Sequence, residues 1–282
     1  MKIKRLIARL DIKGPNLVKG IGFEGLRVLG KPSDFAKRYY ADGIDELSYQ
    51  DVKASLHKQK FLKDIINQTA SGIFIPLTVG GGLENLKDIE AVFNFGADRV
   101  AINTAAINRP ELIREASRNF GSSNLVINVE AVKETDRSYG AFCNNARDQT
   151  GWEVVDWCRK IEDLGAGEIV LSAVGRDGTG EGFDLDLVGL VCDQIDLPVI
   201  AHGGALNAAH IVKLFTQTSA AGVMLASSLH YGCLHRINNS ESSFEQGGNV
   251  KFLRNRRNFS NYKELSVGEI KNALRKCGVH CR

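Results

Sequence analysis

A glycine-rich turn that occurs twice constrains the fold of this chain more than any other feature. The first copy, VGGG at residues 79–82, ends an apolar run that starts at Ile73, and a helical pattern follows directly. Consecutive glycines present bare N–H groups, and the helix adds the positive end of its dipole, so the turn can hold an anion. The second copy, HGG at residues 202–204, follows a similar run from Leu197. One copy is typical of a tight turn, but two indicate a duplicated architecture.

Strand and helix patterns alternate along the whole chain. Eight apolar runs are typical of buried strands, at residues 5–10, 44–50, 73–79, 99–104, 124–129, 168–174, 197–201 and 222–226. Helical patterns lie between them, and helical crossovers imply parallel strands. Positions 122 residues apart also match, including Asn85 with Asn207 and Phe93 with Phe215. We therefore predict an α/β fold, a (β/α)8 barrel built from two half-barrel repeats. An open doubly wound sheet is the alternative, but it gives no reason for the repeat.

The connections between these elements differ in length and composition. A glycine-rich connection at residues 13–31 follows the first strand, and Ser33 is expected to cap the next helix. A polar stretch at 133–151 follows the fifth strand, and a polar insertion at about 238–262 precedes a last helix at 267–276. We expect residues 1–282 to form a single barrel domain that includes this insertion.

Composition excludes several functional classes. The net charge of +3 is too small to imply a nucleic-acid partner, and we interpret the basic run at 251–257 as a solvated loop. No signal peptide or membrane-length apolar segment is evident, so we expect a cytoplasmic protein. The six cysteines include no C-x-x-C pair, and Cys277, His280 and Cys281 lack a regularly spaced fourth ligand, so no metal site is predicted.

Two carboxylates close equivalent strands of the predicted barrel. Asp11 ends the first strand and Glu130 ends the fifth, so they face each other across the mouth at the carboxyl ends of the strands. Such a pair suits general acid–base catalysis, because one group can be held protonated while the other accepts a proton. On spacing alone, ordinary structural carboxylates are an equal alternative. Asp51 and Asp177 point into the same mouth.

The two glycine turns predict two anion sites on opposite sides of this mouth, which would fit a substrate with a phosphate at each end. Lys19 could reach a phosphate or be a solvated loop lysine. His202 could be an acid or base, or a hydrogen-bonded turn histidine. The candidate phosphate-binding residues are Lys19, Asp51, Gly81, Gly82, Asn103, Thr104, Asp177, Gly203, Gly204, Ala226 and Ser227.

Four charged residues stand at or near the starts of strands, at the opposite end of the barrel. They are Arg5, Glu46, Arg99 and Glu168. Charge inside a barrel is costly unless it is paired, so we expect these residues to form an alternating ring. The ring has two interpretations, a structural salt-bridge plug or a polar gate for something small.

These motifs resemble the cyclase subunit of imidazole glycerol phosphate synthase, a histidine-biosynthesis family, over about residues 3–231. The resemblance rests on LD at 10–11, VKG at 18–20, IPLTVGGG at 75–82, RDGT at 176–179 and PVIA at 198–201. It implies a duplicated barrel that takes ammonia from a glutaminase subunit docked at its bottom. Ammonia would pass through the core and then cleave and cyclise a bisphosphorylated aminoimidazole carboxamide ribonucleotide. The products would be imidazole glycerol phosphate and aminoimidazole carboxamide ribonucleotide. No metal or organic cofactor is implied.

The resemblance also implies residue roles. Asp11 would be one catalytic carboxylate, and Arg5, Glu46 and Glu168 would belong to the ammonia gate, with Arg99 where lysine is usual. Glu130 replaces the expected second catalytic aspartate, and its extra methylene displaces the carboxylate by roughly 1 Å, enough to cost about 10²-fold in rate.

Two further positions depart from the family pattern. Arg9 replaces a small residue near Asp11, and we expect its side chain to point away from the barrel interior. His202 also stands where a small residue is usual.

These departures and the polar insertion resemble a divergent branch of cyclase-like subunits found with sugar-modifying genes. An alternative function follows, in which the barrel channels ammonia to a separate sugar amidotransferase for surface-polysaccharide synthesis. That third protein would bind the top face. The cyclase is our first interpretation, because Asp11 and both phosphate turns are intact. Both interpretations share the glutaminase partner.

Overall fold

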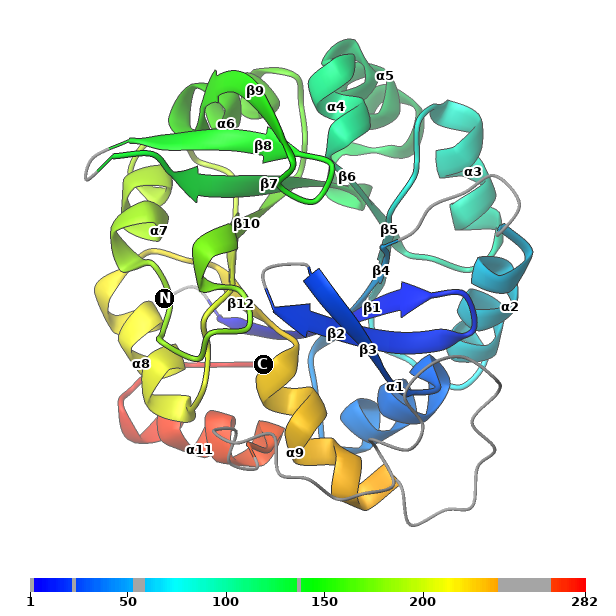
Figure 1. The fold of residues 1–282 in the computed structure, drawn as a ribbon, viewed down its shortest axis with the longest axis vertical. Helices are drawn as coiled ribbons and strands as arrows, with labels where there is room; N and C mark the ends of the chain where they lie inside the picture. Colours follow the sequence, from blue (N-terminus) through cyan, green and yellow to red (C-terminus); the bar gives the residue numbers. More distant parts are fainter. Residues whose placement is uncertain (1–2, 22–23, 53–58, 136–137, 238–264) are drawn as a thin grey trace.

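Parallel strands close into a barrel at the centre of the molecule, and helices surround it (Figure 1). The computed structural model describes residues 3–21, 24–52, 59–135, 138–237 and 265–282. Around the barrel, the described strands are β1 (Arg5–Lys13), β4 (Glu46–Asp51), β5 (Leu77–Gly80), β6 (Arg99–Ile102), β7 (Leu125–Lys133), β10 (Glu168–Ala173), β11 (Val199–His202) and β12 (Gly222–Leu225). Parallel pairing of β12 with β1 and of β10 with β7 closes the circle. The predicted (β/α)8 barrel is confirmed.

Helices follow the barrel strands and cover their outer faces. Their bounds are α1 (Pro32–Ala41), α2 (Gln59–Ala70), α3 (Leu86–Asn94), α4 (Thr104–Asn108), α5 (Glu111–Phe120), α6 (Val154–Asp163), α7 (Leu185–Cys192), α8 (Ala208–Gln217), α9 (Ser227–Ile237) and α11 (Val267–Lys276). Asn85 and Asn207, which match in the sequence repeat, cap the equivalent helices α3 and α8 with their side chains. The repeat therefore extends to the capping chemistry.

Three local expectations were wrong. Lys31, not Ser33, is the N-cap of α1, because Pro32 takes the first helical position and leaves Ser33 buried inside the first turn. Strand β5 starts at Leu77 rather than Ile73, since Pro76 has no N–H to donate to a ladder. Helices α4 and α9 follow the fourth and eighth strands, where the sequence patterns did not indicate them.

Two antiparallel hairpins replace the connections predicted at 13–31 and 133–151. Strands β2 (Asn16–Ile21) and β3 (Glu24–Gly30) extend β1, and β8 (Tyr139–Cys143) and β9 (Asp148–Glu153) extend β7. Each hairpin forms because its barrel strand runs past the barrel and folds back. In Figure 1 the hairpins lie on opposite sides of the barrel opening. They supply equivalent additions to the two half-barrels.

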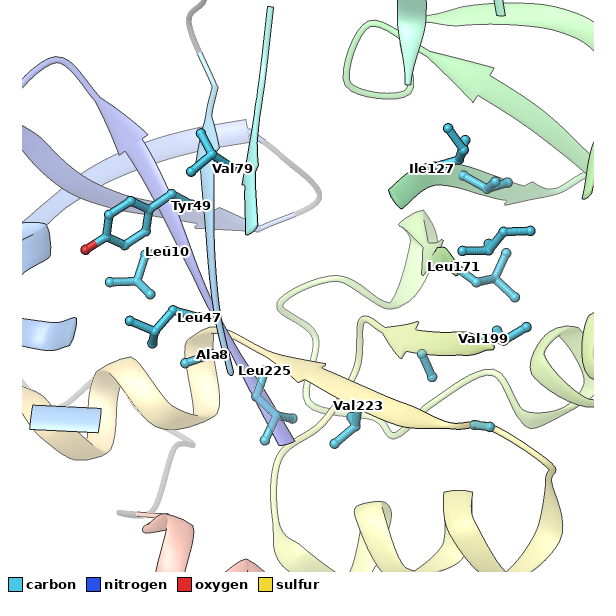
Figure 2. Close-up of a cluster of buried hydrophobic side chains, with 14 of the residues drawn as sticks. Ala8, Leu10, Leu47, Tyr49, Val79, Ile127, Leu171, Val199, Val223 and Leu225 are labelled. Atoms are coloured by element: carbon cyan, nitrogen blue, oxygen red, sulfur yellow. The ribbon is translucent and has the colours of Figure 1, made fainter. Parts of the chain in front are cut away.

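The main core lies between the strands and the helices. Figure 2 shows side chains of this outer layer, including Ala8 and Leu10 of β1 and Leu47 and Tyr49 of β4, all fully buried. Because strand side chains alternate, the intervening residues of β1 face the barrel interior. Arg9 is one of them, so the expectation that it points away was wrong: it shares a face with Asp11, two residues on.

The chain ends pack at the bottom of the barrel. Lys4 pairs with Cys281 in an isolated bridge, and α11 packs against α8. The predicted insertion at about 238–262 and the basic run at 251–257 lie outside the described residues. A single domain over residues 1–282 stays a prediction.

Candidate active site

The barrel interior consists of layers of side chains contributed by alternate strands. One layer comes from β1, β5, β7 and β11, and it holds the apolar Ile7, Val126 and Ile200 with the buried polar Thr78. Ala101, Val170 and Met224 pack against it and complete a small inner apolar cluster. Charged residues lie below this cluster, and polar residues lie above it. The two ends of the barrel are therefore chemically distinct and separated by an apolar core.

The predicted ring of charges forms at the bottom. Arg5 Nη1 lies 3.0 Å from Glu46 Oε1, and its other terminal nitrogen binds Glu168. Arg99 Nη1 lies 2.8 Å from Glu168 Oε1 and 3.7 Å from Glu46 Oε2. Each arginine therefore contacts both glutamates. Burial would lower the pKa of Arg5, but the two glutamates raise it above its ordinary value. The glutamates are buried and the arginines partly exposed, so the ring closes the core from below.

At the opposite end, Asp11 is buried beside two cations. Arg9 Nε donates a hydrogen bond of 2.7 Å to Asp11 Oδ1, and Lys19 Nζ lies 3.8 Å from Oδ2. Burial would raise the pKa of Asp11, but the charges of Arg9 and Lys19 override it and lower the pKa to about 2. Asp11 is thus ionised near pH 7.

Glu130 stands across the mouth on β7, and its surroundings shift its pKa the other way. Burial raises the pKa of Glu130 above its ordinary value, although the N–H of Ala146 donates a 2.7 Å hydrogen bond to Oε2. This hydrogen bond joins the carboxylate of Glu130 to the β8–β9 turn. Two carboxylates with opposite pKa shifts are the usual arrangement for dividing acid and base roles.

The β8–β9 turn that contacts Glu130 has an unusual backbone. Asn144, Asn145 and Ala146 all have positive φ, at 53°, 60° and 59°. Such conformations are uncommon outside glycine and are found at sites where the surrounding structure enforces them. The Asn144 N–H also donates to Thr104 Oγ1 at 3.2 Å. The β8–β9 turn therefore links Glu130 to Thr104 of the first predicted anion site.

Lys19 is not a solvated loop lysine. It lies on β2 with its side chain 1% exposed, and Nζ contacts both carboxylate oxygens of Asp177 at 3.0 and 3.1 Å. Burial would raise the pKa of Asp177, but Lys19 lowers it below its ordinary value. The Lys19–Asp177 pair therefore joins the first hairpin to the loop after β10.

His202 extends the same polar cluster. Its Nδ1 lies 3.1 Å from the carbonyl oxygen of Met224, which can only accept, so Nδ1 carries the proton. Nε2 lies 3.7 Å from Asp177 Oδ1 and has no hydrogen-bond partner among the described residues. Burial, followed by the charge of Arg9, lowers the pKa of His202 to about 4. The ring is therefore neutral near pH 7.

The first glycine turn lines a cavity of about 600 Å³. Asp51, Asn103 and Thr104 of the first predicted site share this cavity, and so does the candidate catalytic residue Glu130. Gly81 has φ +102°, and a Cβ there would lie 2.1 Å from the carbonyl oxygen of Asp51. Only glycine fits this position. Asp51 thus acts on the turn through its backbone.

The second turn has a closely similar geometry in the other half-barrel. Gly203 has φ +101°, and a Cβ on Gly204 would lie 2.1 Å from the carbonyl oxygen of Gly182. The small hollow beside it is lined by Asp177, Ala226 and Ser227, among others. Ser227 also begins α9, where unpaired backbone N–H groups face outward from a helix start. The two glycine turns thus share positive φ and close packing against a neighbouring backbone, although the cavity beside the first turn is far larger.

Carboxylates and glycine turns alternate around the mouth. Asp11 and Glu130 come from β1 and β7, and the glycine turns follow β5 and β11, so each carboxylate lies between the two turns. Sequence reasoning missed Arg9 and the turn at 144–146. The period of two along β1 could have placed Arg9 beside Asp11, whereas no local signal locates the turn against Glu130.

Comparisons with known proteins agree with this geometry. The family described as "Histidine biosynthesis protein" matches residues 5–235. Three similar proteins are each named "Imidazole glycerol phosphate synthase subunit HisF". The one from Legionella pneumophila is 50% identical over 200 residues, 71% of this chain and 94% of that protein. Those from Thermococcus onnurineus and Streptococcus mutans are 43% and 39% identical over 82% and 88% of this chain, and 91% and 99% of their own lengths.

Two further observations concern the described residues alone. None of their helices combines the length and apolar character needed to span a membrane. No three of their histidine, cysteine, aspartate or glutamate side chains gather in a way that could hold a metal ion.

Proposed function

The chain belongs to the histidine biosynthesis protein family, and from this premise we propose that it is the cyclase subunit of an imidazole glycerol phosphate synthase. It uses ammonia from a glutaminase subunit. It converts a bisphosphorylated aminoimidazole carboxamide ribonucleotide to imidazole glycerol phosphate and aminoimidazole carboxamide ribonucleotide. A cytoplasmic location, which the sequence predicts, is part of this proposal.

The observation that carries the proposal is the alternation of carboxylates and anion turns around one mouth. A substrate with a phosphate in each glycine turn lies across the barrel axis, and its reacting centre falls between Asp11 and Glu130. Gly81 and Gly82 act with Asn103 and Thr104 at one phosphate, and Gly203 and Gly204 act with Ala226 and Ser227 at the other. Such two-point anchoring fixes the reacting atoms relative to the catalytic groups.

The opposite pKa shifts suggest separate roles for the two carboxylates. Asp11, held ionised by Arg9 and Lys19, stabilises positive charge on the nitrogen that attacks the substrate. Glu130, whose pKa is raised by burial, transfers protons to and from the substrate as the ring closes. The Ala146 N–H fixes the carboxylate of Glu130 for this transfer.

The bottom face supports docking of the glutaminase. A hollow of about 540 Å³ beside the charge ring is lined by residues 73–77, Asp98 and Arg99. Phe74 lies at this hollow with 82% of its surface exposed, although it is a large apolar residue. Exposed aromatic side chains at a hollow are typical of contact sites for another protein. A partner seated here would deliver ammonia directly to the ring of Arg5, Glu46, Arg99 and Glu168.

The test is turnover of the bisphosphorylated ribonucleotide by the purified chain, with an ammonium salt at alkaline pH and no partner. Supplying ammonia directly bypasses the charge ring, so the assay reports on the mouth alone. We expect turnover by the unmodified chain and a loss of at least about 10²-fold in Asp11→Asn. Asp163→Asn, which changes an exposed carboxylate at the end of α6, is the matched control and should keep full turnover.

Absence of turnover from folded protein would contradict the proposal. It would favour the alternative in which the barrel supplies ammonia to a separate sugar amidotransferase bound to its top face. The relatives do not favour that alternative, because all three carry the synthase name. Rescue of a histidine auxotroph by this chain would exclude it independently.

A further inference from the structure

A layer of large polar side chains lies between the apolar core and the mouth. The core layer described above consists of Ile7, Thr78, Val126 and Ile200. Each of its four strands continues, two residues later, with the next inward-facing position: Arg9, Gly80, Asn128 and His202, respectively. Strand side chains two apart share a face, so these four form the next layer of the barrel interior. Arg9 and His202 are both buried, at 6% and 3% exposed. Arg9 and His202, the two residues that replace smaller ones of the family pattern, therefore belong to the same layer.

One hydrogen bond spans this layer across the barrel. Gly80 leaves room that the Gln50 side chain fills, since a Cβ at residue 80 would lie 2.7 Å from Gln50 Oε1. Gln50 Oε1 accepts a 3.2 Å hydrogen bond from Asn128 Nδ2, and this bond joins β4 to β7. Arg9 and Asn128 also form part of the floor of the mouth cavity. Anything that rises through the apolar core meets this layer before it reaches Asp11.

The charges of the layer select what can cross it. The Arg9 guanidinium presents only N–H donors and no acceptor, and the part of its positive charge that Asp11 does not compensate opposes a cation such as ammonium. His202 Nε2 is a buried acceptor without a hydrogen-bond partner among the described residues, 3.7 Å from Asp177 Oδ1. An unpaired buried acceptor is costly, and a small neutral molecule with N–H donors satisfies it. Neutral ammonia meets both conditions.

We infer that Arg9, Asn128 and His202, with Gln50 bound to Asn128, form an upper gate that admits ammonia to the mouth as the neutral molecule. The inference rests on the proposed function, which supplies the ammonia. The gate is linked to the substrate through Arg9, whose Nε is bound to Asp11 Oδ1. A substrate that engages Asp11 competes for this bond and loosens the layer. With an empty mouth, the gate retains ammonia in the core.

The experiment measures how many glutamines are hydrolysed per product formed, using the full chain in complex with its glutaminase subunit. The unmodified complex should consume about one glutamine per product, and His202→Ser and Arg9→Ala should raise this ratio at least about twofold as ammonia escapes through the mouth. Arg9→Lys keeps a cation in the layer and should restore part of the coupling. His210→Ser, which changes a histidine on the outer helix α8, is the matched control and should keep the ratio of the unmodified complex.

The number of glutamines hydrolysed per product separates a loss of gating from a loss of catalytic rate. Arg9 contacts Asp11, so its loss lowers product formation from either nitrogen source, and the rate with ammonium salt corrects for this. Variants that lose rate equally with glutamine and with ammonium salt, at an unchanged ratio, would overturn the gate while leaving the proposed function intact. An unmodified chain that forms no product from ammonium salt would overturn the proposed function, and the gate with it.

Discussion

At the scale of single residues, the mouth is governed by how cations are shared among buried carboxylates. Lys19 lies nearer to Asp177 than to Asp11, at 3.0 Å against 3.8 Å, and Arg9 is the hydrogen-bond partner of Asp11. Arg9 is therefore the main cation that compensates the negative charge of Asp11, because Lys19 lies farther away. Among the described residues no cation forms an ion pair with Glu130, and burial raises its pKa despite the more distant charge of Arg9.

This sharing predicts how stability depends on pH. The pKa of Asp11 is about 2 in the folded chain against an ordinary 3.8, so its contribution is present above about pH 4 and lost as pH falls toward 2. Between pH 5 and pH 3 the contribution should fall by about 1 kcal/mol. Urea unfolding of the unmodified chain and of Asp11→Asn, each at both pH values, measures it. The difference in unfolding free energy between the two proteins should shrink by that amount at pH 3.

A difference that stays constant across these pH values would show that Asp11 is not held below its ordinary pKa. Arg9→Lys provides a second check, because it keeps the positive charge at the site and should preserve most of the pH dependence. Other carboxylates titrate in the same range, but they are common to all three proteins and cancel in the comparison.

The sequence predicted which residues gather at the mouth better than it predicted how they pair. Asp11, Glu130 and Asp177 follow directly from strand ends, because the position of a strand end fixes which mouth a side chain reaches. Arg9 was assigned to the wrong face, although its spacing of two from Asp11 carries the correct answer. The pairing of Lys19 with Asp177 could not be predicted, since it depends on a hairpin that brings residues 158 positions apart together.

At the scale of elements, each anion turn is shaped by backbone packed against backbone. A Cβ on Gly81 would lie 2.1 Å from the Asp51 carbonyl oxygen, and one on Gly204 would lie 2.1 Å from that of Gly182. Neither contact can be relieved by moving a side chain. The strand, the turn and the neighbouring loop therefore hold the N–H groups of the turn in a fixed orientation.

Gly81→Ala should therefore damage the first anion turn. The substitution forces a left-handed residue and a backbone clash, and we expect it to cost about 1–3 kcal/mol of stability and to raise the KM for the bisphosphorylated substrate at least about tenfold. Gly175→Ala is the matched control, because a Cβ there meets nothing within 4 Å. Denaturant unfolding and initial rates with ammonium salt measure both effects. Equal behaviour of the two variants would exclude a role for the constrained turn.

The barrel strands and most helices could be predicted because their apolar periodicity reflects burial. The two hairpins could not, because one face of each is polar and their glycines and asparagines are typical of loops. In the second hairpin, Asn144, Asn145 and Ala146 adopt positive φ, which no local pattern indicates for alanine. The turn is held instead by contacts with more distant residues, such as the hydrogen bond from the Asn144 N–H to Thr104 Oγ1, 40 positions away.

At the scale of the whole molecule, the barrel interior has a ring of charges at its bottom and a layer of polar side chains below its mouth. The bottom ring joins β1, β4, β6 and β10, so it links strands from all around the barrel. Its glutamates are about 4–5% exposed and depend on the two arginines for compensation. A buried carboxylate that loses its cation is strongly destabilising, whereas a surface ion pair contributes little.

Arg99→Ala should therefore lower the free energy of unfolding far more than the loss of an arginine from a surface ion pair does. It leaves Arg5 alone to compensate both Glu46 and Glu168, so one buried carboxylate charge is uncompensated, and we expect a loss of about 3–5 kcal/mol in the free energy of unfolding. Arg109→Ala, which breaks a 2.8 Å pair with Glu115 on the surface, should cost less than about 1 kcal/mol. Urea unfolding of both variants at pH 7 makes the comparison. Similar small losses would mean that water already compensates the ring, and that the bottom of the barrel is open rather than closed by its charges.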